Sequence, residues 1–112
     1  MSSADCIFCK IASGQIPAQK VHESDDVIVF RDISPKAPAH LLAIPKKHVK
    51  GLAELRGLEP AIFEAIAQAA ASEKIAASGF RVVLNQGAHA GQEVEHLHFH
   101  ILGGRQLSWP PG

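Results

Sequence analysis

The longest regular pattern of hydrophobic positions predicts one long amphipathic helix. From residue 58 to about residue 77, apolar side chains recur at the three- to four-residue spacing of a helix that buries one face. Pro60 suits the first turn of this helix, and Gly79 suits its C-terminal stop. A second, shorter helix is expected over residues 6–12, with Asp5 as a candidate N-cap.

Short apolar or alternating segments, bounded by turn residues, predict five β-strands. They cover residues 21–23, 27–31, 41–44, 80–85 and 95–102. The first three form an antiparallel meander in outline. The order of these elements predicts an α+β domain, in which an antiparallel sheet carries one long packed helix and a short N-terminal helix. The tail, residues 103–112, contains two adjacent prolines and cannot continue a central strand.

Length and composition fit a single folded domain over residues 1–112. The 11 basic residues cancel the 11 acidic ones, and no basic cluster is longer than Lys46-Lys47, so nucleic acid is not an expected partner. No apolar run is long enough to span a membrane, and the first residues lack the basic start and apolar run of a signal peptide. We therefore expect a soluble, cytoplasmic protein without a membrane partner.

Three of the seven histidines alternate with apolar residues along the last predicted strand. On a strand, His96, His98 and His100 would share one face at steps of about 7 Å, while the residues between them enter the core. Three interpretations are open: a surface strand whose polar face happens to be histidine, a metal site that uses these imidazoles as ligands, and nucleophilic catalysis.

The residues that precede the histidine row suit phosphoryl chemistry. Asn85, Gly87 and residues 91–93 form a loop that can bring an amide side chain and backbone N–H groups to an oxyanion. A neutral imidazole is a good nucleophile near pH 7, and a phosphorylated imidazole is labile enough to be hydrolysed. The loop therefore favours the nucleophilic interpretation.

Cys6 and Cys9 are the only cysteines, and they are spaced as Cys-x2-Cys. A structural disulfide is not expected in a cytosolic chain. A redox pair would be expected where a strand enters a helix, and no strand is predicted before Cys6. Two inert thiols remain an alternative. The third interpretation is a zinc site, because two thiolates at positions i and i+3 face one way on a helix and need two more ligands, usually histidines.

The chain resembles the histidine triad (HIT) proteins. Residues 96–102 have the His-φ-His-φ-His-φ-φ form of that family, where φ is an apolar residue. Residues 30–35, 44–48, 103–106 and 109–112 resemble its nucleotide-binding, purine phosphoramidase branch. The resemblance implies a homodimer whose sheets join across the subunit boundary. It also implies hydrolysis of the P–N bond of adenosine or guanosine 5'-phosphoramidates through a nucleotidyl-histidine intermediate.

The same resemblance implies roles for individual residues. His98 would be the nucleophile, supported by a catalytic set of His40, His96 and His100. The implied nucleotide-binding residues are Ile7, Phe8, Ile11, Phe30, Asp32, Ile33, Leu42, Asn85, Gly91, Gln92, Glu93, His98, His100 and Trp109. Asp32 would accept from the ribose hydroxyls, although it could instead cap the turn at Ser34. Glu93 stands where many members have Ser or Thr, which leaves the proton donor to the leaving group open.

A structural zinc ion is implied at Cys6, Cys9, His48 and His96, with no part in the chemistry. The C-terminal tail would cross the dimer and place Trp109 near the partner's active site; a frayed terminus is the alternative. Two alternative functions remain open. One is a nucleotide-binding regulatory module with incidental turnover, and the other is a metal-dependent hydrolase that uses the histidine row as ligands.

Overall fold

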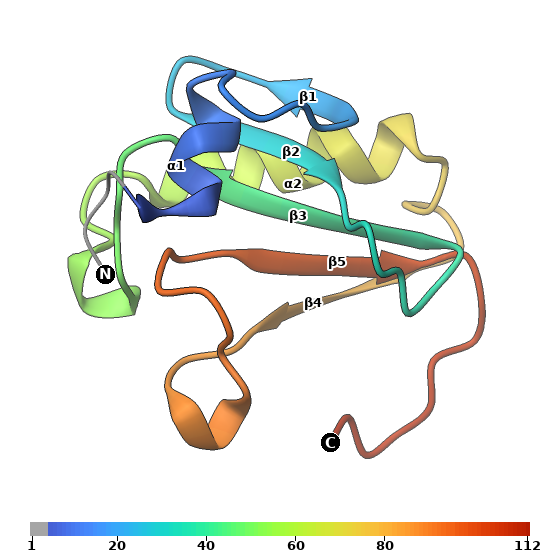
Figure 1. The fold of residues 1–112 in the computed structure, drawn as a ribbon. Coiled ribbons are helices and arrows are strands. Elements are labelled where there is room, and N and C mark those ends of the chain that lie inside the picture. The colour runs from blue at the N-terminus through green and yellow to red at the C-terminus, as the bar shows by residue number, and fades with distance from the viewer. Residues whose placement is uncertain (1–4) are drawn as a thin grey trace.

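The computed structural model describes residues 5–112 as a five-stranded antiparallel sheet with two α-helices (Figure 1). Residues 1–4, on which part of the signal-peptide argument rests, lie outside the described residues. The elements are α1 (Ile7–Ala12), β1 (Lys20–Glu23), β2 (Val27–Arg31), β3 (Ala39–Pro45), α2 (Glu59–Ser72), β4 (Phe80–Leu84) and β5 (Phe99–Gly103). The strand order is β1-β2-β3-β5-β4. The predicted α+β class, with one long helix and one short N-terminal helix, is confirmed.

Helix α2 covers one face of the sheet, behind the strands in Figure 1. Its apolar stripe, which includes Ile62 and Ile66, packs on alternate residues of the strands. Those strand residues are Val27 and Val29 of β2, Ala39, Leu41 and Ala43 of β3, and Phe99 and Ile101 of β5. The main hydrophobic core therefore lies on the α2 side of the sheet.

Helix α1 covers part of the opposite face, in front of the strands in Figure 1. Phe8 of this helix packs with a second buried cluster made of the intervening strand residues, Ile28, Phe30, Leu42 and Ile44. The N-cap of α1 is Cys6, whose Sγ accepts a hydrogen bond from the backbone N–H of Cys9 at 3.4 Å, so the prediction of Asp5 as the N-cap is wrong. The remainder of this face is open and carries the candidate site.

The long helix is shorter than its hydrophobic pattern predicts. It ends at Ser72, because Lys74 adopts a left-handed conformation with a φ of 61° that turns the chain. The turn carries Ile75 back into the core, where it is buried. The apolar residues beyond Ser72 therefore belong to the core without belonging to the helix.

The last strand also differs from its prediction. β5 begins only at Phe99 and continues to Gly103, so Gly103 belongs to the strand and not to the tail. His96 and His98 lie before it in irregular backbone. The prediction of a regular row of three imidazoles along one strand face is therefore wrong, although Phe99 and Ile101 do enter the core as expected. β3 likewise extends through Pro45, where the prediction ends at residue 44.

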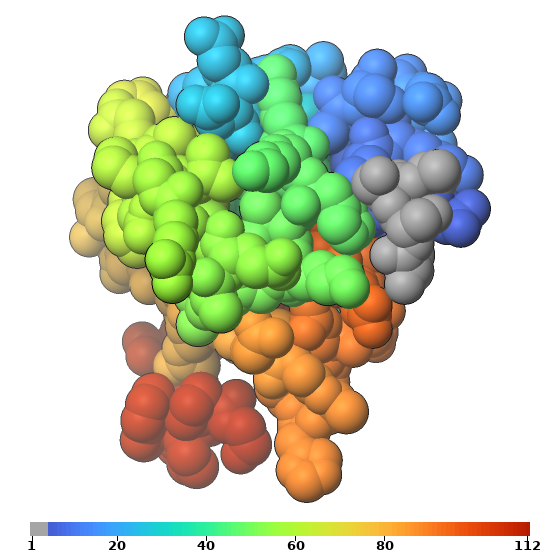
Figure 2. Space-filling model, turned by 90° about the vertical axis from the view of Figure 1, so that its left-hand side faces the viewer, coloured from blue at the N-terminus to red at the C-terminus, as the bar shows by residue number. Residues whose placement is uncertain are grey.

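The C-terminal segment lies apart from the sheet, beyond β5 in Figure 1 and beside the body of the molecule in Figure 2. Trp109 is 78% exposed in the single chain. β4 is an edge strand, and it leaves Phe80 and Val82 partly exposed. Between residues 5 and 112, no helix combines the length and apolar character that crossing a membrane requires.

Candidate active site and metal centre

A cleft of about 1060 Å³ opens on the α1 side of the sheet. Apolar side chains from α1, β2 and β3 line one part of it, and histidines and loop residues line the other. The predicted nucleotide-binding residues along its walls are Ile7, Phe8, Ile11, Phe30, Asp32, Ile33, Leu42, Asn85, Gly91, Glu93, His98 and His100. An apolar pocket with a few convergent polar groups is typical of a small-molecule site.

Two predicted nucleotide-binding residues do not line the cleft. Gln92 holds its own loop together, since its Oε1 accepts from the backbone N–H of Gly87 at 2.9 Å and its Nε2 donates to the carbonyl of Val94 at 3.1 Å. Trp109 projects into solvent, with the guanidinium of Arg81 5.8 Å from its ring centre. In this single chain, neither side chain contributes to the walls.

Sequence analysis missed several residues that line the cleft. They are Ile16, Pro17, Ala18, Gln19, Arg31, Ser34, Lys36 and Val94. Arg31 and Ser34 lie within residues 30–35, Lys36 and Val94 directly follow residues 30–35 and the loop before the histidines, and residues 16–19 follow the short helix after a turn. Proximity in sequence to the predicted site residues was the signal that could have identified them, because neighbouring residues often line the same cleft.

The backbone fixes the tautomer of His98. Its Nδ1 lies 2.7 Å from the carbonyl oxygen of His96, and the ring is 6% exposed. Because a carbonyl can only accept, Nδ1 carries the proton, and the neutral ring keeps its lone pair on Nε2. The ring of Phe8 packs edge-on at 5.0 Å between centroids and restrains the imidazole from the side. His98 thus has the protonation pattern of a nucleophile.

A hydrogen-bond relay sets the opposite tautomer in His100. The backbone N–H of Lys36 donates to Nδ1 of His40 at 3.0 Å, so the proton of the neutral His40 ring lies on Nε2. That Nε2 lies 2.9 Å from Nδ1 of His100 and donates to it, which leaves the His100 proton on Nε2. Burial lowers the pKa of both rings, which favours the neutral forms on which this relay depends.

Asp32 lies beside the same relay, next to Nε2 of His40. Its Oδ1 accepts from the backbone N–H of Ser34 at 2.8 Å, and its Oδ2 is 3.4 Å from Nε2 of His40. The turn-capping alternative is therefore present in the structure. Asp32 also lines the cleft, so its second oxygen remains available to a ligand on that side.

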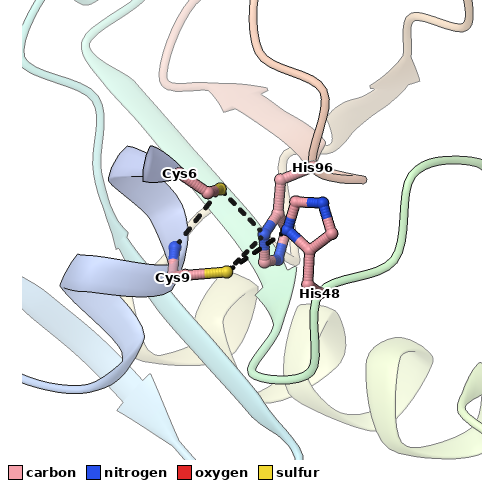
Figure 3. A group of neighbouring side chains, drawn as sticks. All are labelled: Cys6, Cys9, His48 and His96. Atoms are coloured by element: carbon pink, nitrogen blue, oxygen red, sulfur yellow. Dashed lines mark hydrogen bonds between the residues drawn. The ribbon is translucent and has the colours of Figure 1, made fainter. Parts of the chain in front are cut away.

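Two thiols and two imidazoles converge beside the cleft (Figure 3). Sγ of Cys6 lies 3.3 Å from Nδ1 of His96, and Sγ of Cys9 lies 3.3 Å from Nδ1 of His48 and 3.5 Å from Nδ1 of His96. All four donor atoms lie within 4.8 Å of one another. In Figure 3, Cys6 at the N-cap of α1 and Cys9 within the helix point toward the two histidine rings.

These separations fit a tetrahedral zinc site. Zinc–sulfur bonds of about 2.3 Å and zinc–nitrogen bonds of about 2.0–2.1 Å at a tetrahedral angle place sulfur and nitrogen roughly 3.6 Å apart. The observed sulfur–nitrogen distances are close to that value. Nε2 of His96 donates to the carbonyl of Pro45 at 2.8 Å, which turns the lone pair of its Nδ1 toward the thiols.

The environment of the cluster keeps a free thiol protonated. Burial, reinforced by the neighbouring Cys6, raises the pKa of the Cys9 thiol to about 11. Without a cation, Cys9 therefore keeps its proton at neutral pH, and metal binding would release it. Within residues 5–112, Nε2 of His48 is buried without a hydrogen-bond partner, so that ring is held through its Nδ1.

Comparison with known proteins places this architecture in a family. The HIT domain model matches residues 13–107. The chain belongs to the HIT domain family. The resemblance found in the sequence is thereby confirmed. Cys6 and Cys9 lie before the matched range, so the domain match by itself says nothing about the metal cluster.

Relatives within the HIT family extend this comparison over nearly the whole chain. The 14 kDa zinc-binding protein of Brassica juncea is 42% identical over 114 residues, which cover 96% of this chain and 100% of that protein. Adenylylsulfatase HINT1 of Arabidopsis thaliana is 42% identical over 117 residues, which cover 99% of this chain and 79% of the relative. A crystal structure of a HIT family hydrolase from Legionella pneumophila matches with a TM-score of 0.91 and 46% identity, covering 96% of this chain and 100% of that chain. These HIT relatives support hydrolase activity for this chain.

Proposed function

We propose that this HIT protein is a purine nucleoside phosphoramidase that hydrolyses the P–N bond of adenosine or guanosine 5'-phosphoramidates. The observation that carries this proposal is the fixed tautomer of His98, which keeps a lone pair on Nε2 at the wall of a cleft large enough for a nucleotide. The relative named adenylylsulfatase HINT1 supports a substrate that contains an adenylyl group. The substrate would be activated at phosphorus, the atom that an imidazole attacks.

The cleft offers a separate region to each part of such a substrate. The purine would occupy the apolar part, between walls that include Phe30 and Leu42. Asp32 would accept from the ribose hydroxyls, and Asn85 would bond near the phosphate and ribose. His100 would donate its Nε2 proton to a phosphoryl oxygen, as the relay through His40 prescribes.

The reaction would follow two displacements at phosphorus. The lone pair of His98 Nε2 forms a bond to phosphorus as the P–N bond of the substrate breaks, and the departing nitrogen takes the electron pair and a proton. Water then attacks phosphorus, the bond to Nε2 breaks, and its electron pair returns to the ring. The water supplies the oxygen of the mononucleotide and releases one proton, which balances the proton that the departing nitrogen took, so that His98 ends neutral as it began. His40 and His96 position the reacting rings without bonding to phosphorus.

Cys6, Cys9, His48 and His96 would hold a zinc ion that ties α1 to the segment carrying the nucleophile. When bound, such an ion supplies structural stability and no reactive position, because four protein ligands close the site. We also propose a homodimer whose sheets continue across the exposed edge strand β4, and a cytoplasmic location, where thiol ligands stay reduced. The tail would then reach the partner's active site.

Turnover of an adenosine phosphoramidate by the His98→Ala variant tests the proposal. We expect kcat to fall by several orders of magnitude, on the order of 10³-fold or more, with the affinity for AMP nearly unchanged. Turnover within tenfold of the wild type would refute His98 as the nucleophile. A chiral phosphorothioate substrate should give net retention at phosphorus, and inversion would indicate direct attack by water.

A chelator separates the two alternative functions from this one. A metal-dependent hydrolase would lose turnover when the metal is removed, even while the protein stays folded. A regulatory binding module would bind AMP but turn over phosphoramidates only slowly, whether or not the chelator is present. Fast turnover that survives the chelator supports the phosphoramidase.

A further inference from the structure

Glu93 places a carboxylate at the histidine side of the cleft. It lines the wall together with His98 and His100. Burial lowers the pKa of His100, and the charge of Glu93 acts in the opposite direction on that ring, so the carboxylate lies within electrostatic reach of it. Glu93 is exposed and therefore lies at the mouth of the cleft, on the same side as the ring proposed to bind a phosphoryl oxygen.

The two acidic residues among the described walls of the cleft differ in their partners. Asp32 accepts from the backbone N–H of Ser34 and lies near Nε2 of His40. Glu93 makes no hydrogen bond or ion pair within the described part of the chain, and its electrostatic effect on His100 is the interaction that remains. Its negative charge is therefore available to a ligand.

The two basic side chains that line the cleft, Arg31 and Lys36, are not paired with Glu93. The guanidinium of Arg31 is bound in two places to the carboxylate of Glu73, at 2.5 and 2.7 Å. Nζ of Lys36 donates to the carbonyl of Ser34 at 3.0 Å. The charge of Arg31 is thus neutralised by Glu73, and Lys36 is held at a backbone carbonyl. Among residues 5–112, no cation forms an ion pair with Glu93, so a phosphate bound next to Glu93 would meet an unpaired carboxylate.

We infer that Glu93 determines the leaving-group specificity of this site, selecting leaving amines that carry a second positive charge and disfavouring leaving groups that carry a negative one. This inference rests on the proposed phosphoramidase function. With the purine in the apolar region and the ribose at Asp32, as proposed above, the group expelled from phosphorus would be the part left to face Glu93, which lines the same cleft. A cation on that group offsets the repulsion between the carboxylate and the phosphoryl oxygens.

The test compares three adenosine 5'-phosphoramidates whose leaving amines differ mainly in charge. These are the mono-adenylated 1,2-diaminoethane, which carries a free ammonium, the propylamine derivative, which is neutral, and the β-alanine derivative, which carries a carboxylate. The wild type is compared with Glu93→Gln, which removes the charge at constant size, and with Glu93→Asp, which keeps it. Glu64→Gln on the exposed surface of α2 removes the same charge far from the cleft.

We expect the wild type to prefer the diamine over the β-alanine substrate in kcat/KM. In Glu93→Gln this ratio should fall by on the order of tenfold, as expected for one charge interaction in a partly screened cleft. Glu93→Asp and Glu64→Gln should keep the wild-type order of substrates. Adenylyl sulfate, whose leaving group is anionic, should be hydrolysed faster by Glu93→Gln than by the wild type.

Different results would refute the specificity role of Glu93 and the phosphoramidase function. If the wild type hydrolyses the three substrates and Glu93→Gln changes their ratio by less than twofold, the specificity role is refuted and the phosphoramidase function stands. If the wild type hydrolyses none of them, the proposed function fails, and the role of Glu93 fails with it. Circular dichroism of the variants establishes that a changed ratio does not come from unfolding.

Discussion

Phe8 connects the Cys/His cluster, the proposed nucleophile His98 and the apolar wall of the cleft, so its truncation should affect all three. Its ring is 7% exposed and packs edge-on against Phe30 at 5.8 Å, His96 at 5.9 Å and His98 at 5.0 Å between centroids. Phe8→Ala removes this ring from a helix of fewer than two turns, which cannot move far enough to close the space.

The expected loss of unfolding free energy follows from this burial. Truncation of a buried phenylalanine costs about 3–5 kcal/mol. Because Phe8 also borders the open cleft, water can fill part of the space, and we expect the lower end, about 3 kcal/mol. The affinity for AMP should fall roughly tenfold through lost apolar contact with the base, since about 1.4 kcal/mol of binding free energy corresponds to that factor.

Urea denaturation followed by circular dichroism measures the first quantity, and isothermal titration with AMP measures the second, both in zinc-saturated protein. Phe8→Leu is the control, because it keeps most of the apolar volume and should lose only about 1 kcal/mol. A loss below 1 kcal/mol in Phe8→Ala, with AMP affinity equal to that of the wild type, would refute the claim that this ring holds the site together.

Three further predictions concern the metal, the histidines and the tail. Protein purified without added metal should contain about one zinc per chain, and a chelator should lower Tm more than it lowers kcat; absence of zinc with both thiols freely titratable would return Cys6 and Cys9 to inert thiols. Burial lowers the pKa of His40 and His100 below 6.5, so the unfolded chain binds more protons as the pH falls below that value. In urea denaturation, the contribution of these two histidines to the free energy of unfolding should therefore be constant above pH 6.5 and should decline below it. An increase in the free energy of unfolding on acidification would contradict the burial argument. Truncation before Ser108 should leave AMP affinity nearly unchanged but alter the relative kcat/KM of large and small leaving amines by more than about twofold, and an unaltered ranking would favour a frayed terminus.

The elements that local patterns define were predictable from the sequence. Strand β2 has the bounds that its apolar run predicts, and α1 begins one residue after its prediction. The long helix ended early because a left-handed residue, Lys74, interrupts it, and the composition around Lys74 carries no glycine or proline to signal this turn. Ile75 lies outside the helix but continues its spacing of apolar residues, so hydrophobic periodicity alone could not predict where the helix ends.

The candidate site depends on contacts that local patterns do not encode. The bond between the His98 ring and the His96 carbonyl breaks the regular strand, and no periodicity predicts it. The convergence of Cys6 with His96 joins positions 90 residues apart and was expected only from the family resemblance. The direction of Gln92 toward its own loop was not foreseen, because an amide can bond to backbone or ligand with equal ease.

The alternation of side chains along β3 and β5 has a consequence for how this chain can change under selection. Leu41 and Ile101 face the α2 core, while His40 and His100, on the same two strands, face the cleft. Substitutions at Leu41 and Ile101 are therefore tested by folding, whereas substitutions at His40 and His100 are tested by chemistry. Ile44 is the exception on the cleft side, because it is fully buried in the cluster that packs under α1. A mutational library confined to the cleft-lining positions of these strands can explore new substrates while the α2 core stays unchanged, whereas a one-residue insertion in either strand would exchange the two faces at once.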